Sequence, residues 1–374
     1  MFDYGTLREI WWLLLGVLLI GFALTDGYDL GVGAILRLLG RDDVERRMVI
    51  EAIEPNWEGN QVWFILGGGA IFAAWPALYA ASFSGFYFAL LLVLLALILR
   101  PVGFVFRNKL PNPAWRNTWD WALTIAGAVP ALVFGVAFGN LFLGAPFQFS
   151  DDMRVSYDGG LFDLFHPFAV LAGVVSLAML VMHGASFAAM RVEDPVGARA
   201  RRIARVAAMV TATAFAAAGV WLVSLDGQVV TSVIDPLAAS NPLYKHVSVQ
   251  AGAWLNNYST HPWILVAPVL AAVGLLGVLT LPSRGFALVA SGVSVASIIL
   301  TAGFSLFPFL LPSSSHPAHG LTVWDASSSA LTLQIMLLAT AVLLPIVLAY
   351  TTWAFRVMRG QVTRQHVVES EDLY

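Results

Sequence analysis

The sequence contains no cysteine, and charged side chains make up only 11% of its 374 residues. The lack of cysteine excludes disulfide bonds, thiol catalysis, iron–sulfur clusters and thiolate metal sites. The net charge is −3, and no basic tract of the kind that binds nucleic acid is present. The first ten residues carry Asp3 and Glu9 against Arg8, which is not the basic start of a cleavable signal peptide. We therefore expect the first apolar segment to stay in place as an anchor.

Most of the residues in the chain are apolar. Hydrophobic residues make up 59% of the chain, and the mean hydropathy is +0.77, which indicates an integral membrane protein. A membrane-spanning helix needs about 20 apolar residues. Nine windows meet this length, at 9–37, 58–78, 80–104, 120–144, 163–189, 204–225, 260–281, 286–311 and 329–355. The sequence thus predicts an all-α bundle of about nine transmembrane helices. It forms one membrane domain over residues 1–360, followed by a loose, polar cytoplasmic tail at 361–374.

Lysine and arginine predict the orientation of the bundle, because cytoplasmic loops are enriched in both. Nine spans place 17 of the 20 basic residues on one side, and leave Arg8, Arg154 and Lys245 on the other. This segregation predicts an external N-terminus and a cytoplasmic C-terminus in a bacterial inner membrane. It also supports the number of spans, since a wrong number would mix the two sides.

Two loops carry enough apolar residues to be ordered. The cytoplasmic loop 40–55 places Val44, Met48 and Ile53 at helical spacing, which predicts a short interfacial helix. The external loop 226–259 is long, and we expect it to be partly ordered with a short surface helix.

Asp26 and Asp29 interrupt the first apolar segment. A carboxylate within a bilayer-length segment is costly, so it usually faces protein or water and has a function there. The spacing of three residues puts both acids on one helical face. The alternative is that Asp26 only marks the end of a short helix, as an interfacial acid.

Glu58 opens the second span from the cytoplasmic side, directly after Trp57. A carboxylate at a helix N-terminus is favoured by the macrodipole, and it also suits the mouth of a proton path. Asn60 and Gln61 continue the polar groups into the membrane, which favours the second interpretation over a plain helix-start acid.

Asp120, between two tryptophans, and Asp325 are interpreted as helix-start acids of the fourth and ninth spans. For Asp325 we expect bonds from the backbone amides near Ser327.

Histidine is too scarce within the spans to hold a haem. Axial ligands to a haem in a helical bundle come from facing helices, but only His166 and His183 lie in a predicted span, the fifth. They are separated by 17 residues, or about 25 Å along a helix, so they cannot hold one iron between them. Small residues at Gly67, Gly68 and Gly69, and at Gly135 with Gly139, could let helices approach closely.

Several long motifs resemble subunit II of the cytochrome bd-type ubiquinol oxidases. They run nearly end to end in the same order: WWLLLGVLLIGFALTDGYDLGVG, PNWEGNQVWFILGGGAIFAAWPALYA, SGFY, RPVGF, GVAFGN, ASNPLYK, AGAWL and LTVWDASSSALTL. The resemblance implies a respiratory oxidase that oxidises ubiquinol or menaquinol and reduces dioxygen to water. It also implies a similarly folded subunit I as partner, which carries two b haems and one d haem. A small third subunit, membrane lipid and a structural quinone are further components found in some members.

The resemblance also assigns roles to residues. It implies a proton path from the cytoplasm through Glu58, beside Trp57, where members commonly have aspartate. Asp26 and Asp29 match acids of the first helix whose role is less settled. It implies no catalytic residue and no metal ligand in this chain.

Two other functions fit the residues alone. One is a proton-coupled secondary transporter, although neither inverted repeats nor broken helices are evident. The other is a pure scaffold whose acids are all structural.

Overall fold

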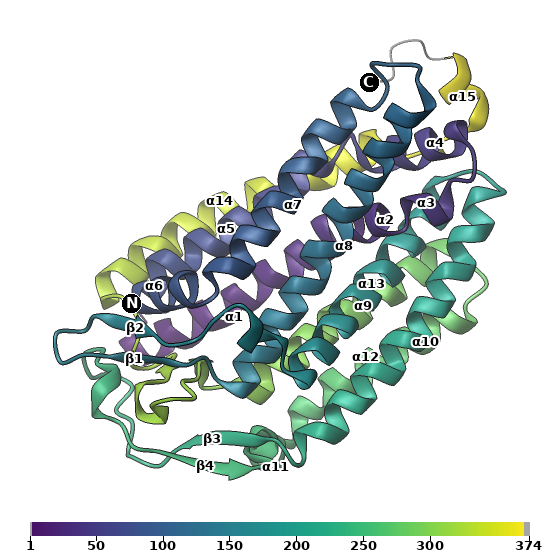
Figure 1. Cartoon of the computed structure of the whole chain (residues 1–374). Coiled ribbons are helices and arrows are strands. Elements are labelled where there is room, and N and C mark those ends of the chain that lie inside the picture. The colour runs from purple at the N-terminus through teal and green to yellow at the C-terminus, as the bar shows by residue number, and fades with distance from the viewer. Residues whose placement is uncertain (1, 370–374) are drawn as a thin grey trace.

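The computed structural model describes residues 2–369, whose helices lie side by side in one elongated bundle (Figure 1). The α-helices are α1 (Tyr4–Leu24), α2 (Asp26–Ala34), α3 (Leu36–Leu39), α4 (Asp43–Ile53), α5 (Trp57–Ala74), α6 (Pro76–Gly85), α7 (Tyr87–Phe106), α8 (Pro113–Leu143), α9 (Pro167–Arg191), α10 (Val196–Leu222), α11 (Asn256–Thr260), α12 (Val266–Thr280), α13 (Arg284–Leu306), α14 (Ala330–Val357) and α15 (Arg364–Glu369). The strands are β1 (Phe147–Phe149), β2 (Val155–Tyr157), β3 (Asp226–Val230), β4 (Val247–Ala251), β5 (Phe309–Leu311) and β6 (Leu321–Thr322).

Eight helical segments within residues 2–369 are long and apolar enough to cross a membrane. They coincide with eight of the nine predicted spans, and α1 and α2 together form the first. The second predicted span is α5, whose 18 residues begin with Glu58, Asn60 and Gln61 and are too polar to qualify by composition. In Figure 1, α5 nevertheless runs along the bundle beside α1, and α1 begins at the end opposite to α15. The all-α membrane fold is thus confirmed.

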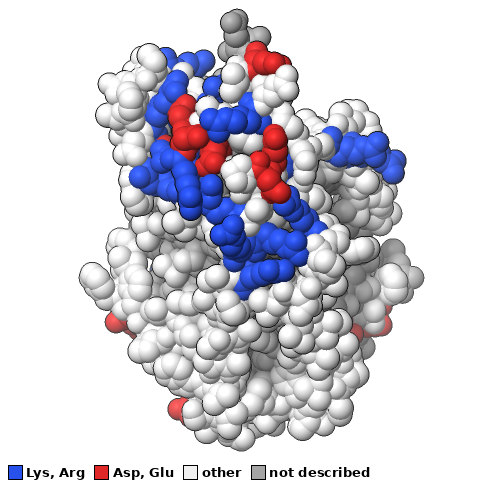
Figure 2. Space-filling view, turned by 90° about the vertical axis from the view of Figure 1, so that its right-hand side faces the viewer, with Lys and Arg blue, Asp and Glu red and all other residues white. Residues whose placement is uncertain are grey.

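Charged side chains gather at one end of the bundle. Figure 2 shows lysine and arginine over the end that carries α4 and the start of α10, and an almost uncharged surface below it. Helix α4 lies within 40–55, where the sequence predicts a short helix. Asp42 caps it by accepting from the amide of Glu45, and its apolar residues Met48 and Ile53 are buried.

Two predicted segments differ in the structure. The third span begins only at Tyr87, because a separate short helix, α6, precedes it. The tail is not loose over residues 361–369: α15 packs on α4, Val367 is fully buried, and Arg364 pairs with Asp42 at 3.3 Å. Residues 370–374 lie outside the described residues. The tail is held because its apolar side chains find an apolar surface on α4 that the sequence pattern alone does not reveal.

Three antiparallel strand pairs, β1–β2, β3–β4 and β5–β6, form small sheets at the other end of the bundle (Figure 1). The external loop 226–259 is ordered as predicted and holds α11, but most of its order comes from β3 and β4. Valines at positions 229, 230, 247 and 249 supply the β-branched residues of this pair. We predicted no strand there, because five-residue strands give little periodic signal.

Glycines allow α2 to lie almost in contact with the backbones of α8 and α9. A Cβ atom added at Gly31 would lie 1.9 Å from the carbonyl oxygen of Leu180, and one at Gly127 would lie 2.4 Å from that of Leu30. The predicted close approach at Gly135 and Gly139 is confirmed, because a Cβ there would meet α9 at 2.4–2.5 Å. A Cβ at Gly67, Gly68 or Gly69 would meet no atom of this chain within 4 Å, so these three glycines bring no helix of the described residues closer.

Gly31→Ala tests the packing of α2. The added methyl group has no room beside the Leu180 carbonyl, and the backbone there cannot move as a side chain could. We expect a loss of at least about 2 kcal/mol in the free energy of unfolding, measured as a lower thermal midpoint of the purified protein. Gly16→Ala, where a Cβ meets nothing within 4 Å, is the control and should unfold like the wild type. Equal midpoints for the two variants would contradict the close packing.

Candidate functional site

The first span bends at Thr25, between α1 and α2. The Thr25 side chain donates to the Gly21 carbonyl at 2.7 Å, and α2 starts anew at Asp26. Asp26 and Asp29 therefore lie in the first turn of α2, where the helix dipole favours a negative charge. Both are buried, with 1% and 2% of their surface exposed, within the 31-residue segment that forms the first span. The structure thus places Asp26 inside the bundle and not at a solvated helix end.

Arg100 neutralises Asp26. This arginine of α7 is 3% exposed, and its guanidinium group donates to both carboxylate oxygens of Asp26, with 3.4 Å between Nη2 and Oδ2. Arg100 is one of the 17 basic residues on the predicted cytoplasmic side, and the sequence does not predict this pairing. Two buried acids in one span are a signal that could have found it, because carboxylates at that depth require a cation from another helix.

Asp29 is only partly satisfied. Asn60 of α5 donates to its Oδ2 at 2.8 Å and to the hydroxyl of Tyr28 at 2.7 Å, whereas its Oδ1 has no hydrogen-bond partner. A buried oxygen without a partner costs about 1–3 kcal/mol. An unsatisfied buried oxygen in a folded protein calls for an explanation, and one explanation is that the oxygen accepts a hydrogen bond or a proton during function.

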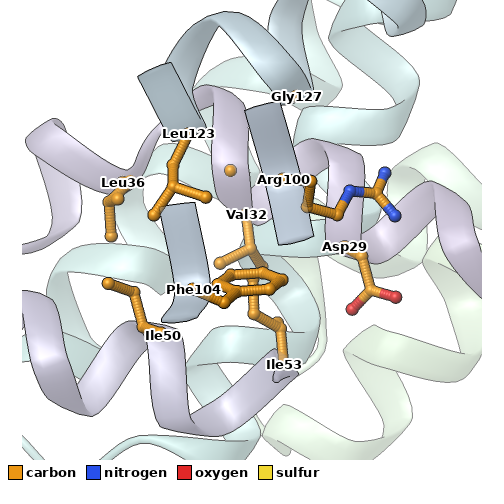
Figure 3. A pocket seen from close by; sticks show the side chains of 10 residues that line it. Asp29, Val32, Leu36, Ile50, Ile53, Arg100, Phe104, Leu123 and Gly127 are labelled. Carbon is orange, nitrogen blue, oxygen red and sulfur yellow. The ribbon is translucent and has the colours of Figure 1, made fainter. Parts of the chain in front are cut away.

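A small cavity of about 10 Å³ adjoins this cluster, a size that admits about one water molecule. Figure 3 shows the guanidinium group of Arg100 and the carboxylate of Asp29 on one side of it, turned away from the apolar side chains Leu36, Ile50 and Leu123. Ile50 and Ile53 come from α4, so the interfacial helix closes the cavity toward the charged end of the bundle.

Trp57 joins this cluster, whereas Glu58 does not. The Trp57 ring centre lies 6.0 Å from the Arg100 guanidinium carbon and 5.8 Å from the Phe104 ring. Glu58, in the first turn of α5, is exposed on the surface of the single chain, and among residues 2–369 no hydrogen bond or ion pair joins it to Asp26 or Asp29. Of the four predicted residues, the structure therefore brings three together and places Glu58 on an outer face.

The interpretation of Asp120 as a helix-start acid is wrong. Helix α8 begins seven residues earlier, at Pro113, and Asp120 is fully buried. It accepts from Arg107 Nε at 2.6 Å and from Arg46 Nη1 at 2.8 Å, and Arg107 and Arg116 also hold Asp43. This network ties α4 to α7 and α8, which holds the cavity wall in place.

Asp325 does not cap the ninth span. It accepts from the Thr322 amide at 2.8 Å and pairs with Lys245 at 2.9 Å, whereas Ser329 caps α14. Burial lowers the pKa of Lys245, and the carboxylate of Asp325 opposes this shift. The pair joins the loop before β4 to the loop before α14.

Both histidines of the fifth predicted span are engaged within the chain. His166 caps α9 by accepting from the amide of Phe168 at 3.2 Å. His183 is buried, with Nδ1 2.8 Å from the Ser291 hydroxyl and Nε2 3.1 Å from the carbonyl oxygen of Leu24. Within residues 2–369, no three His, Asp or Glu side chains form a group that could hold a metal ion.

A second, much larger cavity of about 650 Å³ lies in the half of the bundle remote from α4. Its walls come mainly from α8, α9, α10 and α13, with phenylalanines at 134, 138, 168 and 215. Tyr258 and Ser305 add polar groups, and their oxygens lie 3.1 Å apart. Apolar walls with a few convergent polar groups are typical of a site for a large apolar ligand.

Comparisons with known proteins agree over nearly the whole chain. A family model described as cytochrome bd terminal oxidase subunit II matches residues 7–358. The chain is 52% identical to a probable cytochrome oxidase subunit 2 of Haemophilus influenzae, over 96% of each chain. It is 51% identical to cytochrome bd-I ubiquinol oxidase subunit 2 of Escherichia coli K12, over 98% of each. A solved bd oxidase from Geobacillus thermodenitrificans has the same fold, with a TM-score of 0.65 at 17% identity; the match covers 94% of this chain and 99% of that one.

The Asp26–Arg100 pair yields a prediction about stability. Removing one partner of a buried pair leaves an uncompensated charge and costs about 3–5 kcal/mol. Asp26→Asn and Arg100→Gln should therefore each lower the thermal midpoint of the purified protein. The double variant leaves neither charge and should be more stable than either single one. A double variant whose loss equals the sum of both single losses would show that the two side chains do not stabilise each other.

Proposed function

Because this chain belongs to the cytochrome bd terminal oxidase subunit II family, we propose that it serves a membrane quinol oxidase as scaffold and as part of a proton route. The chain is a subunit of an oxidoreductase complex of the respiratory chain. Reduction of dioxygen to water consumes protons, and a buried reaction site must receive them through polar groups. The observation that carries the proposal is the buried cluster of Asp26, Asp29 and Arg100 behind α4. The family assignment leaves the transporter alternative without support.

The two histidines of the fifth predicted span do not fit a haem. His166 precedes α9, His183 lies 17 residues further along, and both ring nitrogens of His183 already have partners. We therefore assign two b haems and one d haem to the partner, subunit I, together with the oxidation of ubiquinol or menaquinol. A small third subunit remains compatible with this arrangement.

The partner would cover the outer face of α5 and α7. Ile65 and Leu66 of α5 and Leu94 and Leu95 of α7 are exposed on the single chain, and Glu58 is exposed at the start of α5. With the charged end in the cytoplasm, the N-terminus is external and Glu58 lies at the cytoplasmic boundary of the interface. In this arrangement Glu58, beside Trp57, passes protons toward the partner, while Asp26 and Asp29 hold or exchange protons behind it.

Glu58→Gln tests the route, because glutamine keeps the size and hydrogen bonding of the side chain but cannot release a proton. We expect the purified complex to keep its haem content and to turn over at least about tenfold more slowly. Glu58→Asp keeps the carboxylate and should retain most of the activity. Oxygen consumption with a soluble quinol measures both rates. Wild-type turnover in an assembled Glu58→Gln complex would reduce Glu58 to a helix-start acid.

We also propose that the large cavity holds a structural quinone. Its volume and its phenylalanine walls suit an isoprenoid chain, and Tyr258 and Ser305 could bond a carbonyl oxygen of the ring. When bound, such a group could fill the space between the helices without taking part in turnover.

Gly219→Leu tests this site, because Gly219 lines the cavity and a Cβ there meets no atom within 4 Å. The added side chain should occupy the cavity and lower the quinone content per purified complex, as measured by extraction. Gly16→Leu places the same side chain in open space outside the cavity and should keep the full content. An unchanged quinone content in the Gly219 variant would place the quinone elsewhere.

A further inference from the structure

Two groups of acidic side chains stand out at the charged end of the bundle. Those of the first group are each ion-paired with arginine: Asp42, Asp43, Glu45, Asp120 and Asp194. The second group is Glu51, Glu54 and Glu58, which follow one another along α4 and the start of α5. Among the described residues, none of these three carboxylates has a hydrogen bond or an ion pair. Arginines are plentiful at this end, so the missing pairs distinguish the second group from the acids that hold the helices together.

Glu54 is half-buried and stands at an unfavourable place for a negative charge. It directly follows the last residue of α4, Ile53, and its amide donates to the Ile50 carbonyl at 2.9 Å. The C-terminus of a helix carries the negative end of the dipole. Burial, and then the neighbouring Glu51, raise the pKa of Glu54 to about 7. A carboxyl group with this pKa gains and loses a proton near neutral pH.

The other charged groups around Glu54 are engaged or lie farther along α4. Arg47 of α4 and His366 of α15 act on Glu51, where they oppose the rise of its pKa by burial. Arg364 of α15 pairs with Asp42, and Arg37 of α3 bonds to Asn117. On α2, Asp26 is paired with Arg100 and Asp29 is bonded to Asn60; on α9, Arg191 bonds to the Gly360 carbonyl. Among residues 2–369, no cation pairs with Glu54.

The position of Glu54 connects it with the buried cluster. Ile50 and Ile53 form the α4 wall of the 10 Å³ cavity that Arg100 and Asp29 also line. Glu51 and Glu54 each directly follow one of these isoleucines and are partly exposed, whereas neither lines the cavity itself. On the inner side, Asp29 Oδ1 is fully buried and has no hydrogen-bond partner. The cavity thus separates an exchangeable carboxyl group near the surface from an unsatisfied carboxylate oxygen inside.

We propose that Glu54, supported by Glu51, collects protons at the cytoplasmic surface for the route that contains Glu58 and Asp29. The inference rests on the proposed proton route and adds its first residue. Glu54 accepts a proton from water and releases the same proton inward, so no electron moves and no bond other than O–H forms or breaks. Glu51 acts as a positioning charge. Its carboxylate helps to raise the pKa of Glu54 toward the pH of the cytoplasm.

The test is the pH profile of quinol oxidation by the purified complex. A group with a pKa near 7 is protonated in about nine of ten molecules at about pH 6, and in about one of ten at about pH 8. Glu54→Gln should match the wild type at the acidic end, where protons are plentiful, and fall behind it by up to about tenfold at the alkaline end. Glu9→Gln changes an exposed acid at the opposite end of the bundle and is the matched control. A Glu54→Gln profile parallel to that of the wild type overturns the inference.

Glu51→Gln is an independent second variant. Removing the Glu51 charge lowers the pKa of Glu54, so the inflection of the turnover profile should move to lower pH while the maximal rate is kept. If Glu51 and Glu54 were purely structural, the inflection of the turnover profile would stay at the same pH. An inflection that does not move therefore counts against the proposal, even if the Glu54→Gln complex fails to assemble. Haem spectra establish assembly in each case. If Glu58→Gln turns over normally but Glu54→Gln shows the pH-dependent loss, the role of Glu58 fails while that of Glu54 stands.

Discussion

The bundle depends on two deeply buried carboxylates, Asp26 and Asp120, that each meet an arginine from another part of the chain. Asp26 with Arg100 joins α2 to α7, and Asp120 with Arg107 joins α8 to α7. In each pair, both side chains are at least 96% buried. A buried ion pair adds little net stability over an apolar contact, but leaving one member unpaired is strongly destabilising. The pairs therefore act mainly by excluding other arrangements of these helices.

The glycines of α2, α8 and α9 make the cluster around Asp29 possible. With Gly31 and Gly127 at the contacts, the three backbones approach so closely that a methyl group would collide with a carbonyl oxygen. At such distances no water layer fits between the helices, so the polar groups of α2 must find protein partners. Asp29 finds only one, through Oδ2, and the small cavity lies beside it. The unsatisfied oxygen is thus a consequence of the packing that holds α2 in place.

The sequence predicts the bundle well, because spans are long and apolar and because basic residues segregate to one side. It also identifies Asp26 and Asp29 as exceptional, since acids within a span are rare. It does not predict Arg100 as their partner, because a cation near the end of a span resembles a loop charge until the helix is built. Asp120 was misread for the same reason: the start of α8 lies in a stretch whose tryptophans and arginines resemble a membrane boundary. A single sequence shows the periodicity of each helix, but it does not show which side chains of two distant helices will pair.

Helix α5 unites the remaining observations. Its composition falls short of that of the other spans, yet it lies on the outside of the single chain, where Glu58 and Gly59 are exposed. Lipid is a poor environment for a carboxylate and for a helix face with few side chains to pack. A second protein subunit would resolve both difficulties, because it could pack against the exposed Gly69 and supply polar groups to Glu58. A partner on α5, as we propose, accounts for both the low hydropathy of this helix and the exposure of Glu58.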